Sequence, residues 1–279
     1  MPPQSKLLFG TAGVPQSASK KSTVHGIKEI KRLGLDCLEV EFVQGVKMGV
    51  DTAEAVQMEA ESQDLALSVH APYYVSLNSP RPGIRMVSHK RLLRSARIAR
   101  ICGAQSVVFH PGYYGTNTPE QTFETIQDGL KEVVSILRSQ GNPVSLRPET
   151  MGKRSQFGSL EEILFLCQKV EGLKPCIDFS HLHARSGKAN DYLSFYRTLK
   201  KIKLKLGPQA LHDMHIHVSG ILYGDKGEIK HLMLDESDFR YDEWIQALKD
   251  FDVKGMVIIE SPTQEKDALM LKNLYHSTS

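Results

Sequence analysis

Six apolar segments of this sequence end, one after another, in a side chain that can bind a metal ion. They are LALSVH ending at His70, QSVVFH at His110, VSLRPE at Glu149, PCID at Asp178, MHIH with His215 and His217, and MVIIE at Glu260. Imidazole nitrogens and carboxylate oxygens together suit zinc, manganese or iron. Carboxylates gathered without a cation repel one another, and buried unpaired charges are costly. If the segment ends converge, the pattern predicts a metal centre.

Three histidines leave the ligand set open. His181 stands three residues after Asp178 and His183 two residues further on, so only one of the two need be a ligand. Strand side chains alternate between faces, so His217 shares a face with His215. His217 is therefore a ligand, a substrate contact or a core residue.

Another pair of candidate ligands, Glu228 and His231, lies in the long segment after the seventh apolar run. Their spacing of three suits one turn of a helix, which would put both side chains on one face. The alternative is a solvated pair on the surface.

The apolar segments alternate with longer amphipathic stretches. The strands and helices that these two kinds of segment predict must position the candidate ligands. Strands are expected at Leu7–Gly10, Cys37–Phe42, Ala66–His70, Ser106–His110, Val144–Glu149, Cys176–Asp178, Met214–His217 and Met256–Glu260, and helices at Val24–Leu33, Thr52–Ser62, Ser88–Cys102, Pro119–Ser139, Leu160–Gln168, Tyr192–Lys203, Tyr241–Lys249 and Glu265–Tyr275. This alternation favours an α/β fold, a single (β/α)8 TIM barrel, whose strand ends face one mouth where active sites lie. An open doubly wound sheet would show a Gly-rich phosphate loop after its first strand, and GTAGVP is not one.

The composition is that of an ordinary packed protein. The chain has 279 residues, of which 41% are hydrophobic and 24% charged, and no Pro/Gly/Ser-rich linker divides it. We therefore predict one domain over residues 1–279. The net charge of +3 neither indicates nor excludes a nucleic-acid partner.

No signal for export or membrane insertion is visible in the sequence. The start, MPPQSKLLFG, lacks the regions of a signal peptide, and no apolar stretch of 18 residues occurs. The four cysteines, Cys37, Cys102, Cys167 and Cys176, form no CxxC pair, which favours reduced and mostly buried thiols. We expect a cytoplasmic protein with no membrane partner.

Several of the segments resemble the signatures of the endonuclease IV family, whose members are TIM-barrel hydrolases of abasic DNA. The similar segments are HAPYYVSL at 70–77, FHPGYYG at 109–115, RPETMGKRSQFGS at 147–159, PCIDFSH at 175–181, MHIHVSG at 214–220 and IIESP at 258–262. The resemblance runs from the third expected strand to the eighth. Its most specific parts are the Asp-x-x-His and His-x-x-Tyr segments.

The resemblance implies a zinc site of two or three ions, with manganese as an alternative. The implied ligands are His70, His110 and Glu149 for one ion, Glu149, Asp178, His215 and Glu260 for a second, and His181 and His231 with a further carboxylate for a third. The family usually has Asp two residues before the last of these histidines, where this chain has Ile229, so Glu228 or His217 would replace it. The family's Asn-Asp-Ser-Lys is likewise replaced by His217-Val218-Ser219-Gly220, which marks a divergent branch.

The implied activity is an apurinic/apyrimidinic endonuclease that cuts duplex DNA 5′ of an abasic site, leaving a 3′-hydroxyl and a 5′-deoxyribose phosphate. Glu149 would be the catalytic residue, bridging ions and orienting the nucleophile. Tyr73 matches a family residue that inserts toward the damaged DNA, and the expected phosphate contacts are Lys47, Arg147, Lys153 and Arg185. Loop tyrosines Tyr74, Tyr113, Tyr114 and Tyr223 would either fill the gap in the DNA or pack in their loops. We expect a monomer.

Two other functions compete with this one. A sugar isomerase or epimerase on a similar barrel would need only one metal, held by Glu149, Asp178, His215 and Glu260. A non-catalytic protein would bind abasic DNA and leave it uncut. Metal content separates the first alternative, because one ion per chain favours the isomerase and two or three favour the endonuclease.

Overall fold

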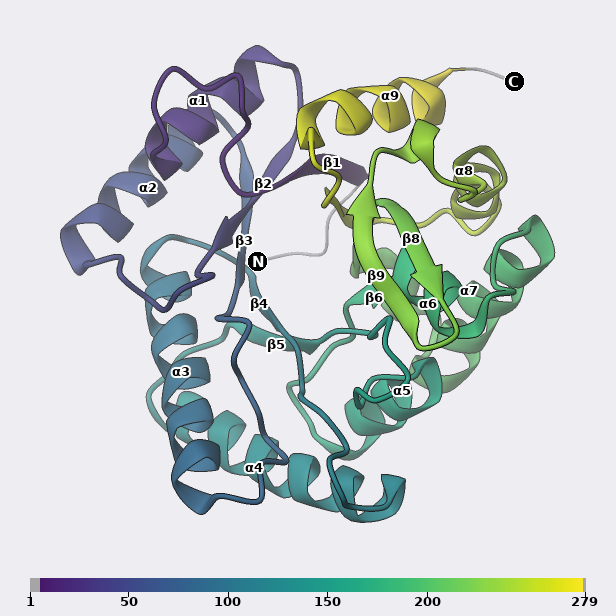
Figure 1. The fold of residues 1–279 in the computed structure, drawn as a ribbon. Coiled ribbons are helices and arrows are strands. Elements are labelled where there is room, and N and C mark those ends of the chain that lie inside the picture. Colours follow the sequence, from purple (N-terminus) through teal and green to yellow (C-terminus); the bar gives the residue numbers. More distant parts are fainter. Residues whose placement is uncertain (1–5, 278–279) are drawn as a thin grey trace. The chain divides into compact units, whose positions relative to one another are not determined.

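The computed structural model describes residues 6–277, and within them eight parallel strands alternate with helices. The strands are β1 (Leu7–Ala12), β2 (Cys37–Glu41), β3 (Ala66–His70), β4 (Ser106–Phe109), β5 (Ser145–Pro148), β6 (Ile177–Asp178), β7 (Met214–Val218) and β10 (Gly255–Ile259). Their order in the sheet is β5-β4-β3-β2-β1-β10-β7-β6. The predicted fold class, a single (β/α)8 TIM barrel, is confirmed (Figure 1). Residues 1–5, on which the expectation about a signal peptide partly rests, lie outside the described residues.

The helices follow the strands as expected, with one addition. They are α1 (Thr23–Arg32), α2 (Val50–Ser62), α3 (Pro82–Ile101), α4 (Pro119–Ser139), α5 (Leu160–Lys169), α6 (Phe179–Ser186), α7 (Tyr192–Leu206), α8 (Tyr241–Asp250) and α9 (Gln264–His276), with short 3₁₀ turns at Pro208–His212 and Leu234–Glu236. Helix α6 is the addition. Helix α3 begins six residues earlier than the expected Ser88, with Pro82 in its first turn, where a missing amide costs nothing.

The described chain forms two compact units. Unit 1 takes in the chain up to Leu38, Gly152–Arg154 and the chain from Ile177 onward, and unit 2 takes in Glu39–Met151 and Ser155–Cys176. The prediction of one domain over residues 1–279 stays a prediction.

In unit 2 the parallel strands β3, β4 and β5 carry the candidate ligands at their carboxyl ends. Their interior residues are buried, as expected for strands covered on both faces. The amide of Ala71 donates to the carbonyl of Val108 at 2.8 Å. The amide of Glu149 donates to the carbonyl of Phe109 at 3.1 Å. These bonds bring the histidine-bearing ends of β3 and β4 level with the end of β5.

In unit 1 the strands β1, β10, β7 and β6 lie side by side. Asp178 of β6 is the register partner of His217 of β7, and Ile258 of β10 is the partner of the same histidine. The amide of Glu260 donates to the carbonyl of Val218 at 3.0 Å. Three candidate ligands therefore share one end of this part of the sheet.

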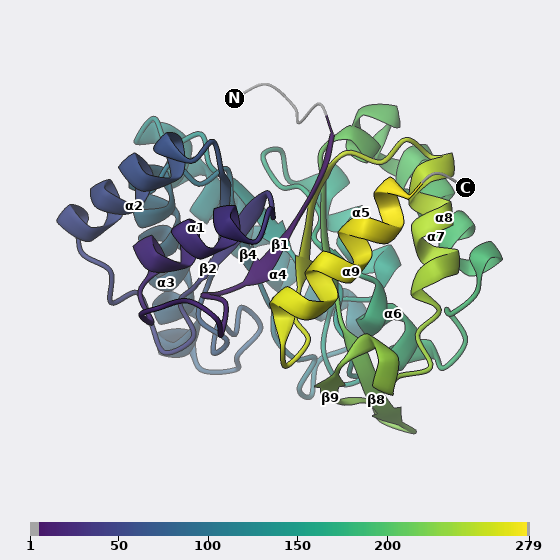
Figure 2. The ribbon, with the colours of Figure 1, turned by 90° about the horizontal axis from the view of Figure 1, so that it is seen from above.

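Unit 1 also contains an antiparallel hairpin, β8 (Gly220–Gly224) and β9 (Gly227–Leu232), beside α6 (Figure 2). The expectation of a helical turn around Glu228 is wrong, because this residue lies in β9. Leu222 pairs with Lys230 and Tyr223 with Glu228, so Ile229 is an extra residue in β9. Such a bulge re-aims the side chains on either side of it.

Among residues 6–277, no helix has the length and apolar character needed to cross a membrane. Within the same residues the four cysteines form no disulfide, and Cys37, Cys102 and Cys176 are buried.

Candidate metal centre

The first set of candidate ligands, the β3–β5 group, consists of His70, His110 and Glu149 in unit 2. Nε2 of His70 lies 3.4 Å from Oε2 of Glu149, and Nε2 of His110 lies 3.1 Å from the same oxygen. His70 and Glu149 are buried, and His110 keeps part of its ring exposed. One carboxylate oxygen therefore faces two imidazoles at the ends of three neighbouring strands.

The surroundings of His70 orient its ring and raise its pKa. Its Nδ1 lies 2.7 Å from the carbonyl of Ala71, so Nδ1 carries the donated hydrogen and Nε2 faces Glu149. Burial lowers the pKa of His70, but the hydrogen bond with Glu149 and the charges of Glu41 and Glu39 raise it to about 10. The surroundings of this ring therefore favour a positive charge, which a bound metal ion would supply.

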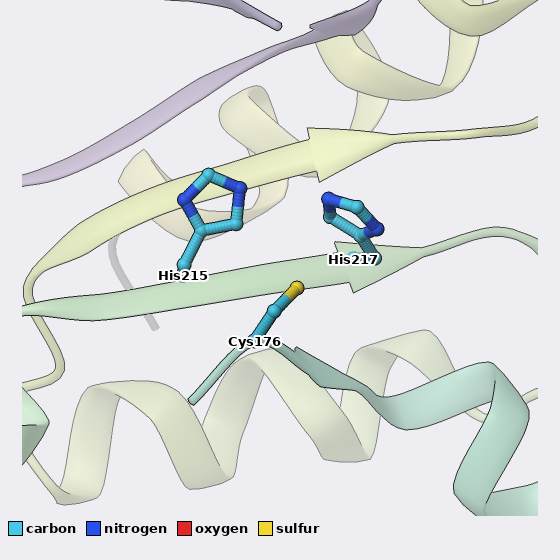
Figure 3. Close-up of side chains that lie close together, drawn as sticks. All are labelled: Cys176, His215 and His217. Carbon is cyan, nitrogen blue, oxygen red and sulfur yellow. The ribbon is translucent and has the colours of Figure 1, made fainter. Parts of the chain in front are cut away.

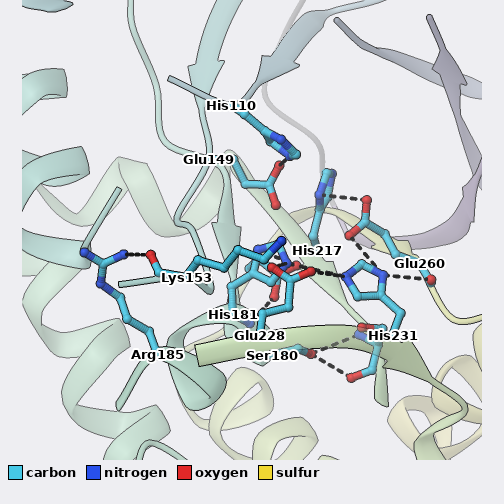
Figure 4. Close-up of polar contacts among 12 residues, drawn as sticks. His110, Glu149, Lys153, Ser180, His181, Arg185, His217, Glu228, His231 and Glu260 are labelled. Carbon is cyan, nitrogen blue, oxygen red and sulfur yellow. Dashed lines mark hydrogen bonds and ion pairs between the residues drawn. The ribbon is translucent and has the colours of Figure 1, made fainter. Parts of the chain in front are cut away.

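The second set, the hairpin group, consists of His181, Glu228 and His231 in unit 1 (Figure 4). Nε2 of His181 lies 3.5 Å from Oε2 of Glu228 and 3.4 Å from Nε2 of His231. Nε2 of His231 lies 3.7 Å from Oε1 of Glu228. The bulge at Ile229 explains how residues three apart in a strand meet at one point, since regular alternation would put them on opposite faces.

Both imidazoles of the hairpin group have an acceptor at the other ring nitrogen. Nδ1 of His181 lies 3.3 Å from Oδ2 of Asp178, and Nδ1 of His231 lies 3.2 Å from the carbonyl oxygen of Glu260. Metal-binding histidines in proteins usually donate their second ring N–H to a carboxylate or a carbonyl. The arrangement leaves Nε2 of each ring for the centre of the group.

The third set, the strand-end group, consists of Asp178, His217 and Glu260 in unit 1, with one ligand atom of each within 4.8 Å of the others. Nδ1 of His217 lies 3.4 Å from Oε1 of Glu260. His215, which the resemblance implied as a ligand, lies two residues earlier on the same face of β7, with its ring edge-on to that of His217 (Figure 3). The structure thus brings His217 to the strand end.

The donor sets fit a zinc-type ion. Zinc binds imidazole nitrogen and carboxylate oxygen at about 2.0–2.2 Å, so two ligand atoms on a tetrahedral ion stand roughly 3.3–3.5 Å apart. The separations of the six facing pairs in the three groups range from 3.1 to 3.7 Å. Calcium and magnesium prefer oxygen-only ligand sets, so the histidines favour a transition metal or zinc.

The aromatic residue expected to contact DNA lies against the β3–β5 group. The ring centroid of Tyr73 is 5.4 Å from that of His70 and 5.4 Å from that of His110. The side chain is nevertheless 48% exposed. Tyr73 can therefore contact both the ligand histidines and a molecule that arrives from solvent.

The expected basic residues divide into exposed and buried ones. Lys47 of unit 2 is exposed, and its Nζ donates to Oε1 of Gln44 at 3.4 Å. In unit 1, Arg185 donates to the carbonyl of Lys153 at 2.6 Å, which ties α6 to the Gly152–Arg154 loop (Figure 4). Arg147 is only 4% exposed and donates to the carbonyl of Pro175 at 3.1 Å. A DNA phosphate does not reach a guanidinium buried in this way, so Arg147 is not retained as a DNA contact.

Comparisons with known proteins point to one fold family. The sequence model of the family described as xylose isomerase-like TIM barrel matches residues 27–274. An uncharacterized protein of Methanocaldococcus jannaschii is 44% identical over 271 residues, covering 97% of each chain. A probable endonuclease 4 of Mycoplasmopsis pulmonis is 30% identical over 150 residues, so the chain spans about half, 52%, of that relative's length.

Two solved structures show the same fold at low identity. A D-tagatose 3-epimerase-like protein superposes with a TM-score of 0.72 and 20% identity, covering 96% of this chain and 95% of the other. Endonuclease IV from Thermus thermophilus superposes with a TM-score of 0.71 and 20% identity, covering 95% of this chain and 98% of the other. The two similarities are nearly equal, so the choice between functions depends on the candidate ligands.

Proposed function

Because the chain belongs to the family of xylose isomerase-like TIM barrels, we propose that it is a metal-dependent endonuclease that cleaves duplex DNA 5′ of an abasic site. The observation that carries the proposal is the surplus of histidines. The β3–β5 group and the hairpin group each bring two imidazoles to a carboxylate, beyond the strand-end group that a single-metal enzyme would need. The partial similarity to a probable endonuclease 4 supports the same assignment.

The proposed ligand set follows the geometry. His70, His110 and Glu149 would hold one zinc ion, the strand-end group a second, and the hairpin group a third. We assign His217 to the second ion in place of His215, and Glu228 to the third ion as its carboxylate. When bound, such ions activate water at neutral pH and neutralise charge on the phosphate.

The chain's own residues supply orientation. The Glu149 carboxylate is fully buried between two imidazoles, where it would accept a hydrogen bond from the attacking water and aim it at the phosphorus. Tyr73 would stack in the space that the missing base leaves, since an abasic nucleotide has no base to unstack. The exposed Lys47 and the partly exposed Lys153 and Arg185 would contact phosphates.

The test is nicking of a duplex that contains one tetrahydrofuran analogue of an abasic site. We expect a cut 5′ of the analogue that a chelator abolishes and zinc or manganese restores. Glu149→Ala should lower the nicking rate by at least about 100-fold, because the carboxylate is central to the β3–β5 group, and should retain much of the DNA affinity. Glu132→Ala, which removes an exposed carboxylate of unit 2, is the matched control. Normal cutting by the Glu149 variant would exclude this carboxylate from catalysis.

The strand-end group alone supports a second candidate, a sugar isomerase or epimerase. Asp178, His217 and Glu260 are carboxylate and imidazole ligands of the kind that one metal ion requires. One ion per chain, with epimerisation of a ketohexose such as D-tagatose and intact abasic duplex, would favour this function. Tight binding of abasic duplex that stays uncut with either metal would indicate a damage-binding protein. A monomeric state and a cytoplasmic location stay predictions.

A further inference from the structure

The ligands of the hairpin group come from two separate pieces of the chain. His181 lies in α6, whereas Glu228 and His231 lie in β9. Helix α6 is itself fixed, because the amide of Ser219 donates to Oγ of Ser180 at 3.0 Å and that hydroxyl donates back to the Ser219 carbonyl at 2.7 Å. A metal ion would bind tightly here only if the hairpin is held in register against α6 before the ion arrives.

A second polar contact joins the same two pieces, and the proposed metal chemistry does not use it. His183, two residues after His181 on α6, is 2% exposed, and its Nε2 lies 3.1 and 3.2 Å from the two carboxylate oxygens of Asp238. The hydroxyl of Tyr223 in β8 donates to Oδ2 of Asp238 at 2.8 Å. The rings of His183 and Tyr223 meet edge to face, with centroids 4.7 Å apart.

The position of Tyr223 links this contact to the ligands. Tyr223 is the cross-strand partner of Glu228, so whatever fixes the tyrosine also fixes the backbone that carries the carboxylate ligand. Asp238 is fixed in turn, since Nδ2 of Asn190 donates to its carbonyl at 2.7 Å and the amide of Arg240 donates to Oδ1 of Asn190 at 2.9 Å. Burial and the hydrogen bond to Asp238 raise the pKa of Tyr223, so the phenol stays protonated and continues to donate.

We propose that His183, Asp238 and Tyr223 are positioning residues that hold the β8–β9 hairpin against α6, so that Glu228 and His231 meet His181 around one metal ion. This inference rests on the proposed function only in that it takes the hairpin group to be a metal site. It adds a polar clamp, built from the second histidine of α6, that sets the affinity of that site.

The experiment measures zinc affinity of the metal-free full-length chain by competition with a chromophoric chelator. Tyr223→Phe, which removes one hydroxyl, should weaken the hairpin site by about tenfold, and Asp238→Ala should weaken it by up to about 100-fold. Asp238→Asn, whose amide oxygen still accepts from Tyr223, should retain more affinity than Asp238→Ala. The matched control is Tyr192→Phe, because the Tyr192 hydroxyl donates to Asp250 at 2.6 Å on another part of unit 1, and it should bind zinc like wild type.

Two further measurements identify the hairpin site and test whether the Tyr223 substitution disturbs folding. His231→Ala should lose one zinc ion per chain, which marks the hairpin site. The metal-free Tyr223→Phe chain should unfold within about 3 °C of wild type, since one partly exposed hydrogen bond contributes little to stability.

Wild-type zinc affinity in both Tyr223→Phe and Asp238→Ala would overturn the inference, and so would full zinc content in His231→Ala. Nicking of abasic duplex by the wild-type chain is scored separately. If the zinc affinities contradict the clamp, the proposed endonuclease activity is unaffected. If the wild-type chain does not nick the duplex, the zinc affinities still decide whether the clamp positions the ligands.

Discussion

At the scale of single residues, burial controls the chemistry of the side chains that could react. Cys102 is 1% exposed, and its Sγ lies 3.5 Å from Sδ of Met48. Burial raises the pKa of the Cys102 thiol to about 12, and that of the Cys167 thiol likewise to about 12. At pH 8 roughly one such thiol in 10,000 is ionised, and only the thiolate is a nucleophile.

We therefore expect Cys102 and Cys167 to resist alkylation in the folded chain. Iodoacetamide at pH 8 should modify them at least about 100-fold more slowly than in the chain unfolded in guanidinium, where the pKa returns to its ordinary value near 8.5. Peptide mass spectrometry over a time course gives both rates for each cysteine. Fast labelling of Cys102 in the native chain would show that its burial is transient.

Single residues of the candidate site were predictable where a strand ends in a ligand. His70 and Asp178 were found because they close apolar runs, and within each unit the register of paired parallel strands brings the ends of neighbouring strands together. His217 was predicted only as one option, since MHIH contains two histidines on one face and the sequence does not show which of them meets the carboxylate ligands. Arg147 looked suited to phosphate binding, but the sequence does not reveal that its guanidinium is buried against the Pro175 carbonyl.

At the scale of elements, a loop that packs against the hairpin turn depends on one glycine. Gly227 has φ +96, and a Cβ there would lie 2.1 Å from the carbonyl oxygen of Gly152. The amide of Glu228 donates to this same oxygen at 3.2 Å. A side chain at Gly227 would both strain the turn and push it off the Gly152–Arg154 loop.

Gly227→Ala should therefore lower the free energy of unfolding by about 1–3 kcal/mol and also weaken zinc binding at the hairpin group. Gly224→Ala in the same turn is the control, because the nearest atom to its added Cβ is Cδ1 of Ile229 at an ordinary 3.5 Å. Guanidinium unfolding followed by circular dichroism gives the first quantity, and chelator competition gives the second. Equal behaviour of the two variants would contradict the role given to this contact.

The elements that escaped prediction are the short ones. Helix α6 follows Asp178 directly, and the Asp178 side chain both caps it, by accepting from the amide of His181 at 2.7 Å, and stands among the candidate ligands. From the sequence, Asp178 is predicted only as a ligand, so the helix that it caps is not predicted. The hairpin was missed because its bulge at Ile229 breaks the alternation by which strands are recognised.

At the scale of the whole molecule, candidate ligands are distributed over both units. The β3–β5 group is complete within unit 2, and the hairpin group is complete within unit 1. The order of strands and helices was predictable because parallel strands are buried on both faces and read as apolar runs between amphipathic helices. The division into two units was not, since no linker composition marks it and the boundaries fall inside or beside strands.

The β3–β5 group lies within unit 2 and the hairpin group within unit 1, so the metal ions of these two groups should be lost separately. His70→Ala and His231→Ala should each lower the zinc content by about one ion per chain, and the double variant by about two. Inductively coupled plasma mass spectrometry of desalted protein gives the count. If either single variant lost all of its zinc, the two groups would not be independent sites.

The bulge in β9 separates the candidate ligands of this hairpin from an exposed apolar side chain. Glu228 and His231 turn toward the ligand cluster, whereas the extra residue between them, Ile229, is 60% exposed. Mutations at that position change the outer surface of the hairpin without touching a donor atom.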